Sequence, residues 1–221
     1  MNGLSDTMAT PTAEPFIVGI GATAQPDSST EQALVLALAA AQRAGARTRM
    51  FGSAALTALP HYLTPASRKC DRGLELVDQV RAADGLILAS PGYHGSVSGL
   101  VKNAIDYLEE TAKDRRPYLD GIPVGLIVTA YGWQATGSTL AALRSIAHAL
   151  RGWPTPLGVT INTVGGVFKE GCCADAAVAA QLEIVGQQVS EFARLRMQSI
   201  SLGDDLVAQR ACSRPSTAMV G

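Results

Sequence analysis

The chain has 221 residues, of which 47% are hydrophobic, and its 18 basic and 19 acidic residues give a formal net charge of -1. This length and apolar content suit one domain with a full-sized core. A balanced charge without long runs of one sign offers no electrostatic footprint for nucleic acid or a membrane surface, so we expect neither as a partner. Aromatic residues make up only 5% while alanine is plentiful, which favours helix-rich α/β packing over an all-β sandwich.

The first residues, 1–14, lack both the basic start and the apolar segment of a signal peptide, and they predict a disordered N-terminal tail. The most apolar helical run, residues 33–41, is about half as long as a bilayer span requires. We therefore expect a cytoplasmic protein with no membrane-spanning segment.

The four cysteines are too few and too irregularly spaced for a disulfide framework or a zinc site, so we expect no bound metal. Cys172 and Cys173 are adjacent and could form a redox couple, but neighbouring cysteines bridge only with a strained backbone. We interpret them as two buried or loop thiols.

Five short apolar runs alternate with helical patterns, an arrangement that is typical of βαβ units and a parallel sheet covered on both faces. The expected strands are residues 16–21, 47–51, 85–89, 122–129 and 156–161. Right-handed crossovers leave few ways to wind five such strands, and 2-1-3-4-5 is one of the common orders. The sequence therefore predicts a three-layer, flavodoxin-like α/β fold with a five-stranded parallel sheet in this order.

Apolar stripes at helical spacing predict four helices between and after these strands. The expected helices are residues 28–44, 100–108, 134–151 and 174–195. Periodicity is lost from about residue 199 onward, which predicts one folded domain over 15–198 and a mobile C-terminal tail over 199–221. Lys102 and Asp106 lie four residues apart and could simply pair on a helix surface.

The first strand is followed by a hydroxyl-rich turn that opens directly into a helix. Thr23, Ser28, Ser29 and Thr30 can donate hydrogen bonds there without adding charge, and a helix N-terminus attracts phosphate. Plain N-capping by Asp27, Ser28 or Ser29 is the alternative interpretation. Neither a P-loop nor G-x-G-x-x-G is present, which argues against ATP and Rossmann-type dinucleotide binding.

The third strand leads into a helix through a glycine-rich segment that would face the first turn across the crevice between strands one and three. Its candidate ligand-binding residues are Pro91, Gly92, Tyr93, His94, Gly95 and Ser96. Gly92 and Gly95 permit close approach of backbone to a flat flavin ring, whose nitrogens and carbonyls backbone N–H groups could bond. Tyr93 or His94 would pack on the ring. A hydrolase is disfavoured because the G-x-S-x-G elbow is missing.

The fourth strand ends in a second cluster of glycine and aromatic residues, Tyr131, Gly132 and Trp133. Trp133 could wall a flavin or stack beside a nicotinamide, or it could cover the edge of the sheet. The order of the strands places this loop at the same crevice.

The segment from Pro91 to Ser96, with the following Leu100 to Asp106, resembles the flavin-ring loop of the NAD(P)H-dependent FMN reductase family. The resemblance implies that residues 91–96 bind the ring of FMN, that Thr23 and residues 28–30 hold its phosphate, and that residues 131–133 close the other edge. It also implies NADPH or NADH as hydride donor and a homodimer or tetramer.

Two features depart from that family. Its first loop commonly carries an arginine where this chain has Ala24 and Gln25, and Asp27 adds an acid. Relatives that donate reduced flavin to a monooxygenase carry a tyrosine in the helix after the third loop, and residues 140–150 contain none. A flavin-dependent monooxygenase is therefore a weaker candidate partner.

Hydride transfer between nicotinamide and flavin is done by the cofactors, so we expect no catalytic acid or base. The expected activity is an NAD(P)H-dependent FMN reductase that passes electrons to free flavin, a quinone or another small acceptor. A flavodoxin-like electron carrier, which would need a strongly acidic docking surface, and a non-catalytic flavin or redox sensor are the alternatives.

Overall fold

The computed structural model describes residues 14–169 and 171–212. The strands are β1 (Phe16–Ile20), β2 (Arg47–Phe51), β3 (Gly85–Tyr93), β4 (Ser96–Val97), β5 (Pro123–Ala130), β6 (Trp153–Asn162), β7 (Phe168–Lys169) and β8 (Cys172–Cys173). The helices are α1 (Ser29–Arg43), α2 (Ser53–Leu56), α3 (Asp71–Ala82), α4 (Gly99–Asp106), α5 (Trp133–Ala149) and α6 (Ala176–Cys212). Two short 3-10 helices, η1 (Ser67–Lys69) and η2 (Tyr107–Thr111), complete the described elements.

The main sheet has the order β2-β1-β3-β5-β6, with all five strands parallel and the short β4 antiparallel beside β3. Counted along the chain without β4, this is the predicted order 2-1-3-4-5, so the predicted fold class is confirmed. The order reverses between β1 and β3, and this switch point is where the ligand crevice of such a sheet lies.

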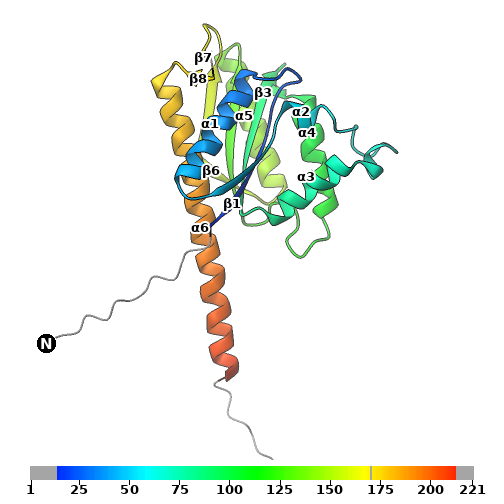
Figure 1. Cartoon of the computed structure of the whole chain (residues 1–221), viewed down its shortest axis with the longest axis vertical. Coiled ribbons are helices and arrows are strands. Elements are labelled where there is room, and N and C mark those ends of the chain that lie inside the picture. The colour runs from blue at the N-terminus through cyan, green and yellow to red at the C-terminus, as the bar shows by residue number, and fades with distance from the viewer. Residues whose placement is uncertain (1–13, 170, 213–221) are drawn as a thin grey trace, which may run out of the picture.

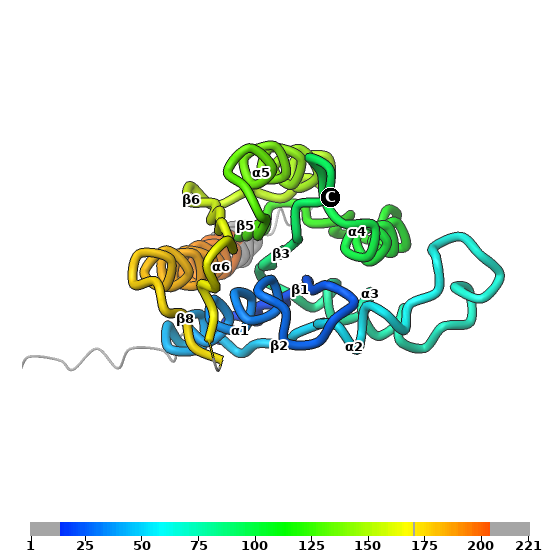
Figure 2. The backbone as a smooth tube through the Cα atoms, turned by 90° about the horizontal axis from the view of Figure 1, so that it is seen from above, coloured from blue at the N-terminus to red at the C-terminus, as the bar shows by residue number. Residues whose placement is uncertain are grey.

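Alternating residues of the strands face opposite layers of helices. Leu86 and Leu88 of β3 pack with α3, α4 and α5, whereas Ile87 and Ala89 pack with α1 and α6. Figure 2 shows the sheet end-on, with α4 and α5 on one side and α1 on the other. This two-sided burial explains why the central strands read as continuous apolar runs.

The third strand is longer than the sequence predicted, because β3 continues from Ala89 to Tyr93 through half of the glycine-rich segment. Pro91 pairs in register with Thr129 of β5, and Gly92 faces Val97 of β4. The segment expected to be an open loop is therefore the end of β3 and its hairpin turn into β4. It is extended because the end of β5 pairs with it.

Residues 52–84 hold α2, η1 and α3, and residues 168–173 hold the hairpin β7–β8, none of which the sequence predicted. The thiols of Cys172 and Cys173 are free. Successive strand residues point to opposite faces, so the two thiols diverge. The interpretation of them as buried or loop thiols was wrong: both lie in β8, where Cys172 is exposed and Cys173 is partly buried.

The last helix continues to Cys212, whereas the sequence predicted its end at Leu195. Figure 1 shows that the far part of α6 projects beyond the sheet, so the described strands of that sheet place no demand for an apolar stripe on it. The predicted tail therefore begins as helix, and its mobility stays a prediction. Residues 1–13 of the predicted N-terminal tail and residues 213–221 lie outside the described ranges. Among the residues described, no helix has the length and hydropathy of a membrane span.

Candidate functional site

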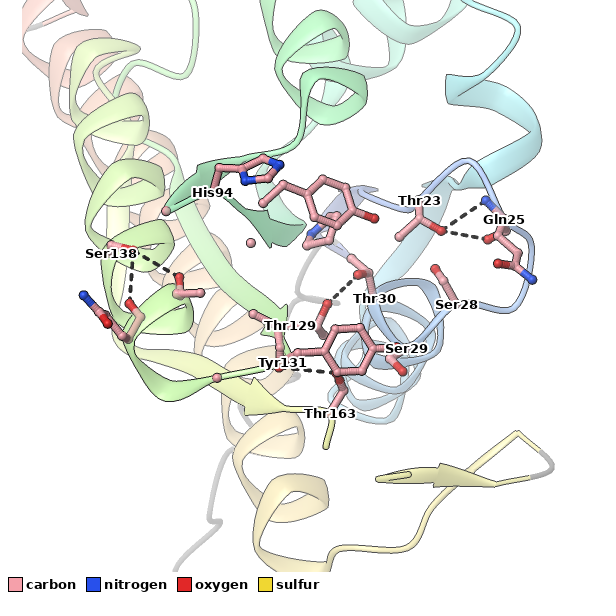
Figure 3. Close-up of a pocket in the computed structure, with 18 of the residues that line it drawn as sticks. Thr23, Gln25, Ser28, Ser29, Thr30, His94, Thr129, Tyr131, Ser138 and Thr163 are labelled. Atoms are coloured by element: carbon pink, nitrogen blue, oxygen red, sulfur yellow. Dashed lines mark hydrogen bonds between the residues drawn. The ribbon is translucent and has the colours of Figure 1, made fainter. Parts of the chain in front are cut away.

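A pocket of about 1020 Å³ opens at the carboxyl ends of β1, β3 and β5, as the switch point predicts (Figure 3). It brings together three loops that are far apart in the sequence. The predicted site residues that line it are Thr23, Ser28, Ser29, Thr30, Pro91, Gly92, Tyr93, His94, Gly95, Tyr131 and Gly132. The other two, Ser96 and Trp133, are not among its lining residues.

The first wall of the pocket is the N-terminus of α1. Ser28 is the N-cap residue, and its Oγ accepts a hydrogen bond from the N–H of Glu31 at 3.4 Å. The capping role considered for Ser28 is thus confirmed. The N–H groups of Ser29 and Thr30 have no intrahelical partner by the geometry of a helix start, which leaves them available to an anion in the pocket.

A carboxylate behind this wall fixes its shape. Glu31 accepts hydrogen bonds from the N–H of Asp27 at 3.0 Å and from the N–H of Ser53, at the start of α2, at 2.8 Å. Asp27 takes a left-handed backbone conformation with φ of 55°. Glu31 therefore ties the turn before α1 to the next loop of the chain.

The first and third loops are joined directly by two buried hydroxyls. Thr30 Oγ1 and Thr129 Oγ1 lie 2.6 Å apart, and both residues are nearly inaccessible to solvent. A hydroxyl pair uses one proton in its mutual bond and keeps a second O–H for another acceptor. The pair thus connects α1 to β5 and can still offer one donor.

The second wall is a two-residue β-hairpin between β3 and β4. His94 and Gly95 form its tip with φ of 52° and 84°, the positive values that a tight primed turn demands. Tyr93 and Ser96 face each other as the closing pair. The N–H groups of the two tip residues, His94 and Gly95, lie outside the ladder. The sequence predicted free N–H donors over residues 93–96, and the pairing of Tyr93 with Ser96 leaves fewer of them free.

A serine fixes the base of this hairpin. Ser90 Oγ accepts a hydrogen bond from the N–H of Ser98 at 3.0 Å and donates one to the carbonyl of Pro91 at 2.9 Å. Ser98 in turn caps α4, because its Oγ accepts from the N–H of Val101 at 3.2 Å. One hydroxyl therefore couples the end of β3 to the start of α4.

Gly92 has a packing role that the sequence did not predict. A Cβ at this position would lie 2.8 Å from Thr139 Oγ1 and 3.1 Å from the carbonyl oxygen of Ala135, both on α5. The missing side chain therefore makes room for a helix, and its role in the approach of a flavin ring stays a prediction. The cause is the approach of α5 to the extended strand, which the sequence does not show.

The third wall is the N-terminus of α5. Gly132 is its N-cap residue and provides no side-chain cap, so the first N–H groups of α5 have no intrahelical partner. Tyr131 is 86% exposed at the mouth of the pocket, and Trp133 is 66% exposed on the first turn of α5. Ser138, one turn further along, also lines the pocket.

Hydroxyl and amide groups dominate the polar lining. Among the described residues that line the pocket there is no Lys or Arg, and Asp27 contributes the single carboxylate. A search of the described part of the chain finds no cluster of three His, Cys, Asp or Glu side chains able to hold a metal ion.

The sequence reasoning missed several lining residues: Gln25, Pro26, Asp27, Thr129, Ala130, Gln134, Ala135, Ser138 and Thr163. Thr129 and Thr163 follow or end apolar strand runs, so the rule that ligands bind at strand carboxyl ends could have found them. Ser138 and Ala135 carry no such local signal, because they reach the pocket only through the packing of α5.

The family model described as NADPH-dependent FMN reductase matches residues 15–165. The chain belongs to this family. The match begins just before β1 and runs to the turn after β6, so it includes every loop of the pocket.

Similarity to known proteins of this kind is moderate. An FMN-dependent NADPH-azoreductase of Staphylococcus aureus is 40% identical over 88 residues, which is 40% of this chain and 43% of the relative. The matching segment thus spans less than half of the length of that relative.

Two solved structures share the fold. An oxidoreductase of Corynebacterium diphtheriae superposes with a TM-score of 0.62 at 22% identity, covering 81% of this chain and 97% of the other. An NADH:FMN oxidoreductase in its apo form superposes with a TM-score of 0.60 at 24% identity, covering 82% and 89%.

The residues of this family member fit FMN. The start of α1 offers unpartnered N–H groups and hydroxyls suited to a phosphate, and the hairpin tip of His94 and Gly95 offers backbone donors suited to a flat heterocycle. Tyr93 and Tyr131 provide aromatic surface at the mouth. These walls face one pocket, as a ligand with a phosphate at one end and a ring at the other requires.

Proposed function

We propose that this protein is an FMN-dependent NAD(P)H oxidoreductase that reduces a small acceptor. The observation that carries the proposal is the meeting of the α1 N-terminus and the β3–β4 hairpin in one pocket at the switch point of the sheet. Membership of the FMN reductase family supports the same assignment.

In this proposal the N–H groups of Ser29 and Thr30 hold the phosphate, and the tip of the hairpin, His94 and Gly95, bonds the polar edge of the ring. Tyr93 and Tyr131 cover the ring and exclude water from part of it. When bound, FMN takes up hydride from the nicotinamide and passes electrons to the acceptor. The side chains position the reactants, and the reaction requires no acidic or basic catalytic group from the protein.

Free flavin, a quinone or another small molecule is the acceptor we propose, and the azoreductase relative adds azo compounds to that class. The site residues predicted from the sequence, Ser96 and Trp133 included, remain proposed flavin contacts. We place the protein in the cytoplasm. A flavin-dependent monooxygenase stays a secondary candidate as partner.

We also propose a homodimer or a tetramer with the pocket near the subunit interface. Tyr93, Tyr131 and Trp133 are 52%, 86% and 66% exposed around the mouth of the pocket. Exposed aromatic side chains of this kind are enriched where proteins associate. Light scattering coupled to size exclusion measures the assembly, and a strict monomer would refute this part.

Anaerobic mixing with NADPH or NADH tests the activity. The purified protein is loaded with FMN, and the absorbance of oxidised flavin is followed while the nicotinamide is supplied. Rapid bleaching, followed by recovery on addition of a quinone or free FMN, is expected for the oxidoreductase. Bound flavin that neither nucleotide reduces would indicate a carrier or a sensor, and a protein that takes up no FMN would refute the proposal.

A further inference from the structure

The phosphate side of the pocket carries an acidic residue at a fixed place. Asp27 lines the pocket, is exposed, and directly precedes the N-cap of α1. Its N–H donates to Glu31 Oε2 at 3.0 Å, and its carbonyl oxygen accepts from Gln32 Nε2 at 2.6 Å. The backbone of Asp27 is thus held from both sides, which keeps this residue beside the pocket at the start of α1.

No cation compensates this carboxylate. The described lining residues include neither Lys nor Arg, and the nearby Glu31 brings a second negative charge one turn into α1. His94, the lining imidazole, is exposed and lies on a different side of the pocket from Thr23 and Ser28 in Figure 3. An anion at the start of α1 therefore meets neutral donors and the carboxylate of Asp27.

Two electrostatic effects oppose each other at this position. The free N–H groups and the positive end of the helix dipole attract a phosphate. The carboxylate of Asp27, which lines the pocket and directly precedes the N-cap residue, repels the same dianion. We infer that Asp27 lowers the affinity for the flavin phosphate, so that this chain binds FMN little more tightly than riboflavin and exchanges it with solution.

This inference rests on the proposed function, because it concerns the phosphate end of the same FMN site. It specifies the substrate class: flavins with and without a phosphate are both bound, and bound flavin is replaceable. A protein of this kind can take a free flavin from solution as its acceptor without first having to expel a tightly held cofactor.

The test compares Asp27→Asn with the unmodified protein. Asparagine adopts the left-handed conformation about as readily as aspartate, so the turn is kept while the charge is removed. Asp120→Asn is the matched control, since Asp120 is exposed and precedes β5, at the end of the strand opposite to the pocket. Dissociation constants for FMN and for riboflavin are measured by quenching of flavin fluorescence.

Asp27→Asn is expected to bind FMN about threefold more tightly or better, with riboflavin affinity changed less than about twofold. The gain should largely vanish in about 1 M NaCl, where the Debye length falls to about 3 Å. Asp120→Asn should leave both affinities unchanged.

An unchanged FMN affinity in Asp27→Asn, or an equal gain for riboflavin, would overturn the inference while the proposed FMN site stands. If the unmodified protein binds neither flavin, the proposed function fails and the inference with it. The riboflavin measurement therefore separates the two failures.

Discussion

Gly92 lacks a Cβ atom, and this allows strand β3 and helix α5 to approach each other closely. The closest atom to its absent Cβ is Thr139 Oγ1, a buried hydroxyl without a hydrogen-bond partner among the described residues. A buried polar atom without a hydrogen-bond partner lowers the stability of the fold. The close contact between Gly92 and Thr139 therefore does not by itself stabilise the protein. The position is sensitive to volume, independently of any ligand.

Gly92→Ala is expected to destabilise the fold by about 1–3 kcal/mol, because the added methyl group overpacks this contact. Thr139→Ala removes the crowded hydroxyl, so in the double variant we expect a recovery of about 0.5 kcal/mol or more relative to additivity. Urea unfolding of the four proteins measures this cycle. Strictly additive changes would show that Thr139 does not limit the space at Gly92.

The phenol of Tyr62 links the loop after β2 to η2. Its hydroxyl donates to Glu110 Oε1 at 2.9 Å. Burial, with this hydrogen bond adding to it, raises the pKa of Tyr62 to about 12. Because the folded-state pKa is raised, the stabilising contribution is complete below the unfolded pKa of about 10 and is lost as the pH rises through about 12.

Tyr62→Phe should therefore cost most stability below about pH 9, and the difference from the unmodified protein should shrink by about pH 11. Glu110→Gln removes the acceptor charge, lowers the pKa of Tyr62 and moves this loss to lower pH. Chemical unfolding across the alkaline range gives the measurement. A cost of Tyr62→Phe that is the same at every pH would contradict the assignment.

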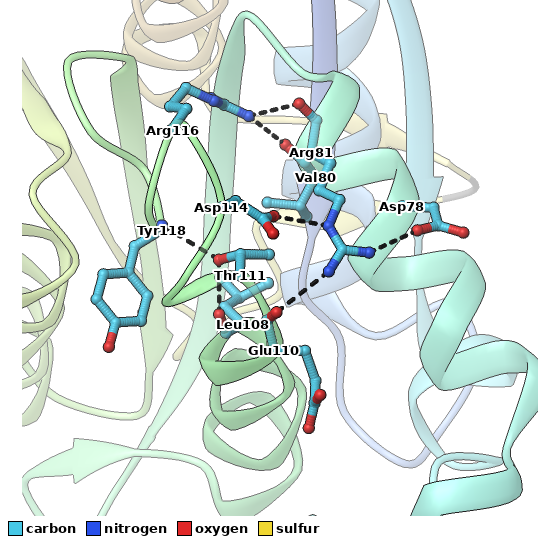
Figure 4. A network of polar contacts seen from close by, with 9 residues as sticks. All are labelled: Asp78, Val80, Arg81, Leu108, Glu110, Thr111, Asp114, Arg116 and Tyr118. Carbon is cyan, nitrogen blue, oxygen red and sulfur yellow. Dashed lines mark hydrogen bonds and ion pairs between the residues drawn. The ribbon is translucent and has the colours of Figure 1, made fainter.

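At the scale of elements, the end of α3 is closed by a residue from the loop before β5. Arg116 Nη2 donates to the carbonyl oxygens of Val80 and Arg81, each at 2.7 Å (Figure 4). Arg81 in turn pairs with Asp78 and Asp114. Burial lowers the pKa of Arg116 from its ordinary value, and the charge of Arg196 lowers it further. The carbonyl groups at the end of the helix are thus bonded by a partly buried guanidinium.

Arg116→Met keeps much of the aliphatic volume but removes the guanidinium donor from both carbonyl groups, of which Val80 keeps the N–H of Ala83 as a partner, so we expect a loss of about 1–3 kcal/mol in the free energy of unfolding. Arg115→Met is the matched control, because Arg115 is exposed. Thermal and urea unfolding of both variants provide the comparison. Equal stability of the two variants would mean that water replaces the guanidinium at no cost.

Some boundaries of helices and strands could be predicted from local sequence patterns alone, and others could not. The range of β2 was predicted to the residue, and Ser28 was placed at the start of α1, because period-2 and period-3.6 patterns and N-caps are local signals. The extension of β3 to Tyr93 was missed, since it depends on the pairing of Pro91 with Thr129 far along the chain. Likewise α6 was ended too early, at Leu195, because helix without a packing partner shows no apolar stripe.

At the scale of the whole molecule, two buried clusters on opposite faces of one sheet hold the loops of the pocket in place. Ile127 of β5 belongs to the cluster with α1 and α6, while Val128 belongs to the cluster with α3, α4 and α5. Both clusters are anchored on the same central strands, so ligand binding between their loops stabilises the entire domain.

FMN at about 100 times its dissociation constant should raise the free energy of unfolding by about 2.7 kcal/mol and the melting temperature by about 5–10 °C. Adenosine monophosphate, which has a phosphate but no flavin ring, is the control. Differential scanning calorimetry measures both. An equal shift with adenosine monophosphate would mean that the pocket does not recognise the ring.

The amino-acid sequence was enough to predict the parallel sheet, its order and a ligand site between the first and third strands, because these follow from hydrophobic periodicity and from rules of chain winding. The contacts within that site depend on the tertiary structure. The hairpin places the N–H groups of His94 and Gly95 at its tip, Thr129 reaches Thr30 across the sheet, and a Cβ on Gly92 would meet α5. Each of these depends on contacts between residues remote in the chain, and such contacts leave no periodic mark in the sequence.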